Sequence, residues 1–422
     1  MDIKTIKTIE SATEKSLSSF AKLSFSLLFL LAVFLWTYSS HGKVPDNTFL
    51  IIGAIFGAYM ALNIGANDVA NNVGPAVGAR ALTLTGAIII AAIFESAGAI
   101  IAGGDVVNTI KSGIINPNLI TDKNSFIWAM TAGLLAGAVW LNFATSIGAP
   151  VSTTHAIVGG VMGAGIASAG FSILNWGSLA EIASSWVISP LLGGIVAAGF
   201  LYFIKKQIVY KENMIEQAQK FVPILIAIMT WAFTTYLILK GLKQLVNISF
   251  LFASGISLLF AFVAYYITKK SIDKNLSNLS NDRSSVNKLF TPALIFGAAL
   301  LSFAHGANDV SNAIGPLAAI NDAIMHGGTS VKASVPFWIM VVGAIGIVIG
   351  LILYGPRLIK TVGSEITELD QMRAFSVAMA TAVTVIIASQ MGLPVSSTHI
   401  AIGGVFGVGF LREALDMTEK NY

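Results

Sequence analysis

Long apolar stretches separated by short polar segments dominate the chain. They fall near residues 24–40, 47–66, 81–103, 125–147, 151–170, 178–204, 221–241, 246–268, 289–305, 334–355, 374–391 and 395–412. Many approach the length of about 20 residues that a helix needs to cross the hydrocarbon core of a bilayer. Barrel strands would be about ten residues long and would alternate in polarity. The pattern therefore predicts an all-α polytopic membrane protein with about 10–12 membrane segments.

Composition supports the membrane prediction. Of the 422 residues, 55 % are hydrophobic and only 11 % are charged, whereas soluble domains average about 25 % charged residues. This composition argues strongly against a water-soluble protein. The chain has no cysteine, which excludes disulfides and thiol chemistry. Nothing in the composition indicates a nucleic-acid partner or a bound cofactor; the expected surroundings are the lipid bilayer.

The N-terminal region, residues 1–46, precedes the repeated sequence described below. Residues 1–23 are charged and amphipathic, and an apolar run of the length seen in signal peptides follows. Glu10 and Glu14 in the leader, and the lack of an A-x-A site, argue against a cleaved signal. We expect an extra transmembrane helix that is retained and peripheral to function.

Two different motifs occur twice, in the same order and at nearly the same separation. The first is GANDVANNVGPAVG at residues 65–78 and GANDVSNAIGPLAA at 306–319; the second is GAPVSTTHAIVGGVMGAG at 148–165 and GLPVSSTHIAIGGVFGVG at 392–409. Two motifs duplicated in step indicate an internal repeat. We predict a first repeat over 47–204 and a second over 289–422, joined by linking helices and basic loops over 205–288.

The distribution of basic residues predicts the orientation. If segments 125–147 and 151–170 form one hairpin and 374–391 and 395–412 form another, most of the 25 lysines and arginines share a face with both termini. The positive-inside rule then places both termini in the cytoplasm of a multi-pass cell-membrane protein. This arrangement places an odd number of membrane crossings between the helix that leads into the first GAND motif and the helix that leads into the second. The two repeats are therefore predicted to be upside down relative to one another, as in many secondary transporters.

The GAND motif places polar residues inside apolar sequence. Gly65 and Gly306 are expected to end a spanning helix, and each Gly-Pro a few residues later is expected to break the chain again. Asp68 with Asn71, and Asp309 with Asn312, are three residues apart and therefore share a helix face. Carboxylate, amide and freed carbonyl oxygens suit an alkali cation. The alternative is that each aspartate caps a helix near an interface.

The second motif combines a turn with hydroxyl residues at a helix start. These are Ser152, Thr153 and Thr154 in the first copy and Ser396, Ser397 and Thr398 in the second. Free N–H groups and the helix dipole make a helix N-terminus an anion site. Two such ends facing each other could surround a tetrahedral oxyanion. Simple caps with glycine packing are the alternative. His155 and His399 would contact substrate or only bond back to the backbone.

Glu95 is an isolated carboxylate within an apolar segment, and no carboxylate occupies the matching place in the second half. Intramembrane carboxylates are functional candidates. Its role would be proton or cation coupling, or a hydrogen bond to a neighbouring helix. Asp105 and His305 are weaker candidates because each lies near a predicted helix end. No nucleophile elbow or paired HExxH is present, so the sequence does not indicate an enzyme.

GANDVANNVG, GANDVSNAIGP, PVSTTH and PVSSTH resemble the signatures of the inorganic phosphate transporter (PiT) family of sodium- or proton-coupled permeases, over roughly residues 47–412. The resemblance implies phosphate as substrate; the residues alone indicate only an oxyanion with a cation. Family residues match Asp68, Asp309, Glu95, Ser152, Thr154, Ser396 and Thr398. Animal members carry a second glutamate where this chain has Ala378, which affects the expected coupling stoichiometry. The resemblance and the apolar outer faces make a homodimer plausible.

Together these observations predict a transporter that imports phosphate with sodium by alternating access. The expected phosphate ligands are Asn67, Ser152, Thr153, Thr154, Asn308, Ser396, Ser397 and Thr398. The expected sodium ligands are Asp68, Asn71, Asp309 and Asn312, and Glu95, His155 and His399 are candidates for coupling. A proton-coupled phosphate or sulfate permease and an anion channel are the alternatives.

Overall fold

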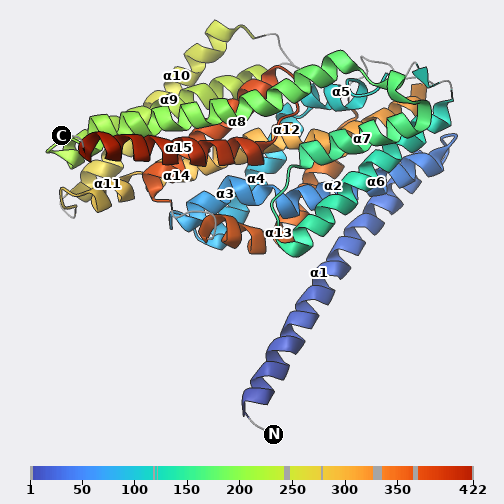
Figure 1. Ribbon diagram of the computed structural model, residues 1–422, viewed down its shortest axis with the longest axis horizontal. Helices are drawn as coiled ribbons and strands as arrows, with labels where there is room; N and C mark the ends of the chain where they lie inside the picture. The colour runs from blue at the N-terminus through green and yellow to red at the C-terminus, as the bar shows by residue number, and fades with distance from the viewer. Residues whose placement is uncertain are drawn as a thin grey trace.

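The computed structural model describes residues 3–116, 119–120, 122–241, 248–276, 279–326, 335–364 and 369–420. Within these ranges the regular structure is helical apart from one isolated bridge between Ile115 and Leu174. Ten of the described helices are long and apolar enough to cross a membrane. The predicted all-α polytopic class is confirmed (Figure 1).

The helices fall into two sets that follow an N-terminal helix, α1 (Ile3–His41). The first set is α2 (Asn47–Asn67), α3 (Val69–Gly78), α4 (Leu84–Ala102), α5 (Gly104–Ser112), α6 (Lys123–Ile147), α7 (Thr153–Ala169) and α8 (Trp176–Ile204). The second set is α9 (Met214–Gly241), α10 (Phe250–Asn275), α11 (Arg283–Leu289), α12 (Thr291–His326), α13 (Phe337–Ser364), α14 (Gln371–Gln390) and α15 (Ser397–Lys420).

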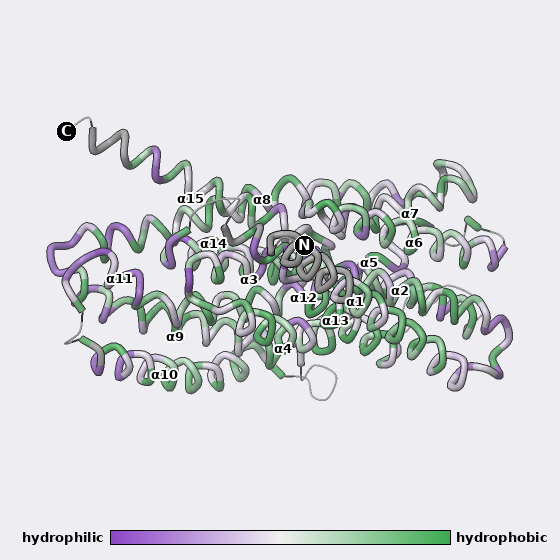
Figure 2. Tube along the Cα trace, turned by 90° about the horizontal axis from the view of Figure 1, so that it is seen from below, coloured by the Kyte–Doolittle hydropathy of each residue, from purple (hydrophilic) through white to green (hydrophobic). Residues whose placement is uncertain are grey.

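Polarity varies along the long axis of the molecule. Hydrophilic residues gather at its two ends, and apolar helices fill the length between them (Figure 2). Large apolar side chains on the peripheral helix α10 are exposed, including Leu251, Leu259 and Phe262. Exposed apolar side chains are stable in lipid. The membrane normal therefore runs along the long axis, and α10 faces hydrocarbon.

The repeated motifs have matching neighbours. α2 packs against α13, and α12 packs against α4. A Cβ atom on Gly65 would lie 1.9 Å from the carbonyl oxygen of Ile347, and one on Gly306 would lie 2.2 Å from that of Glu95. Glycine is required at both positions because the two backbones touch. This correspondence supports the predicted repeat; its inversion stays a prediction.

The predicted helix breaks are only partly present. In the first copy, α2 ends at Asn67, and Asp68 alone separates it from α3, while in the second copy α12 runs unbroken from Thr291 to His326. The expectation that each GAND glycine ends a helix is therefore wrong. Pro75 and Pro316 are held inside their helices; a proline removes only one backbone bond, which neighbouring helices can compensate in a membrane protein.

Two hairpins carry the second motif. α6 packs on α7, and α14 packs on α15. Each hairpin turn begins with a glycine of positive φ, Gly148 at 78° and Gly392 at 70°, just after the end of the preceding helix. This conformation favours glycine because it has no Cβ. Both turns lie near the middle of the long axis, where the two hairpin tips meet (Figure 1).

Candidate functional site

Asn67 braces the first hairpin turn. Its side-chain amide donates to Thr145 Oγ1 at 2.9 Å and to the carbonyl of Ala149 at 3.0 Å, and its oxygen accepts from the amide of Val151 at 3.0 Å. Asn67 is fully buried. Its two donors and its acceptor are thus used within the first repeat.

Asn308 braces the second turn in the same way. It donates to Ser389 Oγ at 3.0 Å and to the carbonyl of Leu393 at 3.1 Å, and it accepts from the amide of Val395 at 3.3 Å. The structure thus separates Asn308 and Asn67 from the other predicted phosphate ligands. We assign both as positioning residues that hold the hairpin tips.

Ser152 and Ser396 cap the helices that follow the turns. Ser152 Oγ accepts from the amide of His155 at 3.1 Å, and Ser396 Oγ accepts from the amide of His399 at 3.2 Å. Such bonds satisfy one of the free N–H groups at a helix start. Capping therefore accounts for these two serines, as the simpler interpretation of the motif predicts.

The remaining hydroxyls converge on Asp68. Thr153 Oγ1, from the first repeat, donates to Oδ2 at 2.7 Å, and Thr398 Oγ1, from the second repeat, donates to Oδ1 at 2.7 Å. Asn71 Nδ2 donates to Thr398 Oγ1 at 2.8 Å. The spacing of three residues does place Asp68 and Asn71 on one face, as predicted, and both meet the tip of the opposite hairpin.

Asp309 and Asn312 form the corresponding group in the second repeat. Ser397 Oγ donates to Asp309 Oδ2 at 3.4 Å. Asn312 Nδ2 lies 3.1 Å from both Thr153 Oγ1 and Thr154 Oγ1 of the first repeat. The two repeats are therefore joined at the site through side chains on both hairpin tips. Hereafter the hydroxyl–carboxylate cluster denotes Asp68, Asn71, Thr153, Thr154, Asp309, Asn312, Ser397 and Thr398.

Glu95 reaches this cluster through a histidine. Its Oε1 accepts from Asn72 Nδ2 at 2.7 Å, and its Oε2 lies 2.8 Å from His305 Nδ1. The other ring nitrogen of His305 lies 2.8 Å from Asp309 Oδ2 and 3.9 Å from Asp68 Oδ2. Glu95 and His305 are fully buried. Three carboxylates thus surround one imidazole away from solvent.

The Glu95–His305 pair has no polar counterpart in the other half. Ile347 contacts Gly65 as Glu95 contacts Gly306, so Ile347 occupies the place equivalent to Glu95. Ile64, which precedes the first GAND motif as His305 precedes the second, is also fully buried. The predicted asymmetry at Glu95 therefore extends to its partner, His305. The sequence made His305 a weaker candidate because its helix was expected to end beside it.

Some acceptors in the cluster have no hydrogen-bond donor among the described residues. They include Asp309 Oδ1 and Asn312 Oδ1, both buried. Buried oxygens without a donor are costly, and a cation can satisfy them. Ligand atoms of Asp68, His305 and Asp309 all lie within 4.8 Å of one another, close enough to hold one metal ion. The carboxylate and amide oxygens of Asp68, Asp309 and Asn312 are the hard donors that an alkali cation prefers, whereas the imidazole of His305 is not; sodium binding at these oxygens stays a prediction.

His155 and His399 lie beside the cluster rather than in it. Both are half-buried, with ring centroids 4.7 Å apart, and His155 stacks edge-on against Trp186 at 3.8 Å. Both line a small cavity of about 360 Å³ next to Trp140. The described contacts of the two rings are thus aromatic, and they connect the first hairpin to the second.

Known proteins are similar to this chain in sequence, and one solved structure is similar to it in fold. The family model described as "Phosphate transporter family" matches residues 64–420, which include both hairpins and both GAND motifs. A protein of Helicobacter pylori strain J99 named "Putative phosphate permease" is 54 % identical over 418 residues, covering 98 % of this chain and 78 % of that protein. A protein of the same name from Haemophilus influenzae is 39 % identical over 376 residues, covering 87 % and 89 %.

One solved structure, "The sodium-dependent phosphate transporter", superposes with a TM-score of 0.82 at 36 % sequence identity. The match covers 86 % of this chain and 90 % of that one. The similarity in three dimensions therefore extends over most of both chains.

Proposed function

This chain belongs to the phosphate transporter family, and from that premise we propose that it imports inorganic phosphate together with sodium by alternating access. Phosphate transport follows from the family, and the family is not one of enzymes. Sodium coupling and the transport mechanism are our proposals. The similarity to a transporter described as sodium-dependent supports sodium as the coupling ion.

The unsatisfied oxygens in the hydroxyl–carboxylate cluster carry the proposal. Asp309 Oδ1 and Asn312 Oδ1 lie on one face of α12 and offer sodium two ligands. Asp68, which also lies near His305, offers a second carboxylate. Two carboxylates buried beside a substrate anion would repel it, so cations at these positions favour phosphate binding electrostatically.

The hydroxyls supply a means of coupling. A threonine or serine hydroxyl has only one hydrogen to donate. Thr153 and Thr398 donate theirs to Asp68, and Ser397 donates to Asp309. We propose that sodium at the carboxylates replaces these donors, so that the hydroxyls turn to phosphate. Phosphate then binds well only after sodium, at the helix starts of α7 and α15.

The charge balance requires more than one cation. Moving one elementary charge through 100 mV is worth about 2.3 kcal/mol. A phosphate dianion entering a negative cell therefore costs about 4.6 kcal/mol per 100 mV before any concentration gradient is counted. At least two sodium ions cancel that charge, and the two GAND aspartates give two places for them.

Domain roles and orientation complete the proposal. Residues 47–204 and 289–422 act as two inverted repeats that rock against one another around the cluster. Residues 1–46 and 205–288 supply the peripheral helix α1 and the linking helices α9 and α10. Both termini lie in the cytoplasm, because the basic loops near 205–220 and 269–288 share their face.

Uptake by purified protein in proteoliposomes tests this function. Sodium and pH gradients are imposed separately, and accumulation of radiolabelled phosphate is followed. We expect accumulation with an inward sodium gradient and none with a pH gradient alone. Accumulation driven only by the pH gradient would contradict sodium coupling, and ionic current without accumulation would indicate a channel. Competition by sulfate at the same concentration as phosphate would contradict phosphate selectivity.

A further inference from the structure

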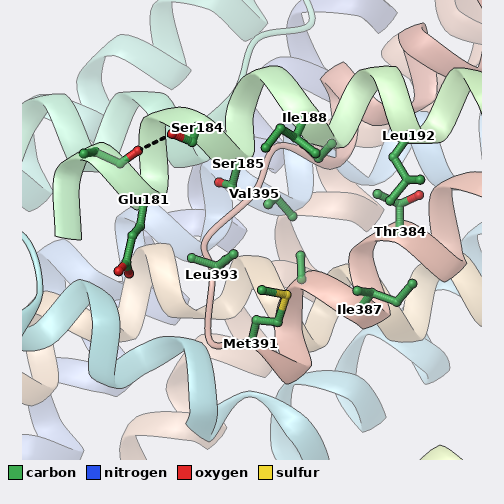
Figure 3. A pocket seen from close by; sticks show the side chains of 13 residues that line it. Glu181, Ser184, Ser185, Ile188, Leu192, Thr384, Ile387, Met391, Leu393 and Val395 are labelled. Carbon is green, nitrogen blue, oxygen red and sulfur yellow. Dashed lines mark hydrogen bonds between the residues drawn. The ribbon is translucent and has the colours of Figure 1, made fainter. Parts of the chain in front are cut away.

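We propose that a cavity between α8 and the second hairpin turn is the water-filled vestibule through which phosphate reaches the hydroxyl–carboxylate cluster. The proposal rests on the function proposed above and adds the route to the site. The cavity measures about 640 Å³ and is lined by α8 on one side and by α14 and its following turn on the other. Figure 3 shows its side chains from close by.

A polar stripe on α8 lines the cavity. Glu181, Ser185 and Ser189 recur every four residues, so they lie on one face of this membrane helix. Thr384 lines the cavity from α14, and Figure 3 shows Glu181 and Ser185 opposite the turn residues Leu393 and Val395. Ser185 and Thr384 donate to carbonyls of their own helices. The carboxylate of Glu181 is costly against lipid and is therefore expected to face water.

Ser189 gives a second, independent indication. It is only 6 % exposed, yet its hydroxyl has no hydrogen-bond partner among the residues that the structure describes. Buried hydroxyls are normally satisfied by protein or by ordered water. By contrast, Ser185 Oγ donates to the carbonyl of Ile182 at 2.6 Å. Ser189 is thus a position in the cavity wall where water or a solute supplies the missing partner.

The second hairpin turn lies between this cavity and the cluster. Leu393 and Val395 line the cavity, and their carbonyls accept bonds from Asn308 and Thr154 on the site side at 3.1 and 2.9 Å. Trp186 Nε1 donates to the carbonyl of Pro394 at 3.2 Å and ties the turn to α8. One stretch of backbone therefore forms the partition.

The turn has the features of a gate. The turn begins at Gly392, where a φ of 70° lets the backbone reverse direction. Thr109 of α5 donates to the Gly392 carbonyl at 2.6 Å and closes the turn against the first repeat. Release of the few bonds at Gly392, Leu393, Pro394 and Val395 would join the cavity to the cluster. Because the turn also braces Asn308, its movement would alter the site and the route together.

A lipid acyl chain is the competing occupant of this space, because Ile188, Leu192 and Ile387 also line it. The two possibilities differ in whether a charged reagent can enter the cavity. A vestibule admits a charged, membrane-impermeant reagent, whereas a space filled by lipid excludes it. If both termini are cytoplasmic, α8 begins at the outer face, so such a reagent added outside intact cells reaches the cavity.

The natural lack of cysteine makes the test direct. We substitute Ser189→Cys and, as a second site, Ser185→Cys. The matched control is Val187→Cys, because Val187 lies on the same helix between them but is 63 % exposed on the protein's outer surface. Cells are treated with a negatively charged methanethiosulfonate, and modification is read as loss of later labelling by a thiol-reactive polyethylene glycol.

We expect modification roughly ten-fold faster at Cys introduced at 185 or 189 than at 187, because a thiolate forms only in contact with water. Sodium and phosphate together should slow the reaction, and modification should block phosphate uptake. Equal, slow modification at all three positions in proteins that take up phosphate would overturn the vestibule and leave the function intact. Failure of unmodified wild-type protein to take up phosphate would instead contradict the function, and the labelling rates would still report on the cavity.

Discussion

Asp309→Asn gives the sharpest test of the proposed sodium site. The substitution keeps the shape of the side chain but removes its charge. Asp309 is almost fully buried, lies 2.8 Å from His305 Nε2 and carries an oxygen without a donor among the described residues. The loss of charge therefore acts on His305 and on the cation that we propose at the oxygen without a donor. Binding of phosphate to the neighbouring hydroxyls should change only indirectly.

The magnitude follows from Coulomb's law. Two unit charges about 4 Å apart at an effective dielectric constant of about 20 interact by about 4 kcal/mol. An asparagine retains one oxygen ligand, and removal of the buried carboxylate also removes its desolvation cost. We expect a net loss of about 2 kcal/mol in sodium binding, equivalent to about a 30-fold higher half-saturating sodium concentration.

The assay is phosphate uptake in proteoliposomes as sodium is varied at saturating phosphate, and as phosphate is varied at saturating sodium. Asp322→Asn is the control, since Asp322 is a buried carboxylate further along the same helix that pairs with Lys111. It should lower stability and leave the sodium dependence of the folded protein unchanged. An Asp309→Asn protein with a normal sodium dependence and a raised KM for phosphate would refute the assignment.

Three further predictions concern the neighbours of the cluster. Asn308→Ala should remove three bonds from the second turn and lower the maximal uptake rate without a selective change in sodium dependence, at a cost of about 1–3 kcal/mol in stability measured by thermal unfolding. Gly306→Ala should lower stability by about 1–3 kcal/mol because its Cβ would overlap the Glu95 carbonyl, whereas Gly159→Ala, with open space around it, should not. Glu95→Gln should lower the uptake rate by removing the charge opposite His305, and a normal rate would show that this pair serves packing alone.

The sequence was most informative where the signal is a repeated pattern. The apolar segments predicted the helical class, and the glycine at the start of each hairpin turn was visible in both copies of the motif. The spacing of Asp68 to Asn71 correctly placed both side chains on one face. These features depend on neighbours along the chain, which is why the pattern alone reveals them.

The sequence did not show which side chains contact one another in the folded protein. Whether a given asparagine holds a turn or faces a ligand depends on which helix lies beside it, so the sequence assigned Asn67 and Asn308 to phosphate although they brace the hairpin turns. His305 looked peripheral because its helix was expected to end. Only the packing of α12 against α4 shows that it joins Glu95 to both aspartates.

The sequence by itself determined that this protein is a helical membrane protein with two related halves and oxygen-rich motifs within them, because hydropathy and repetition are local properties of the chain. The tertiary structure decided which of those oxygens converge. Residues from opposite halves, such as Thr398 and Asp68, meet only because the hairpin tips are brought together by helices far apart in sequence. The division of roles among the hydroxyls is therefore a property of the packed fold.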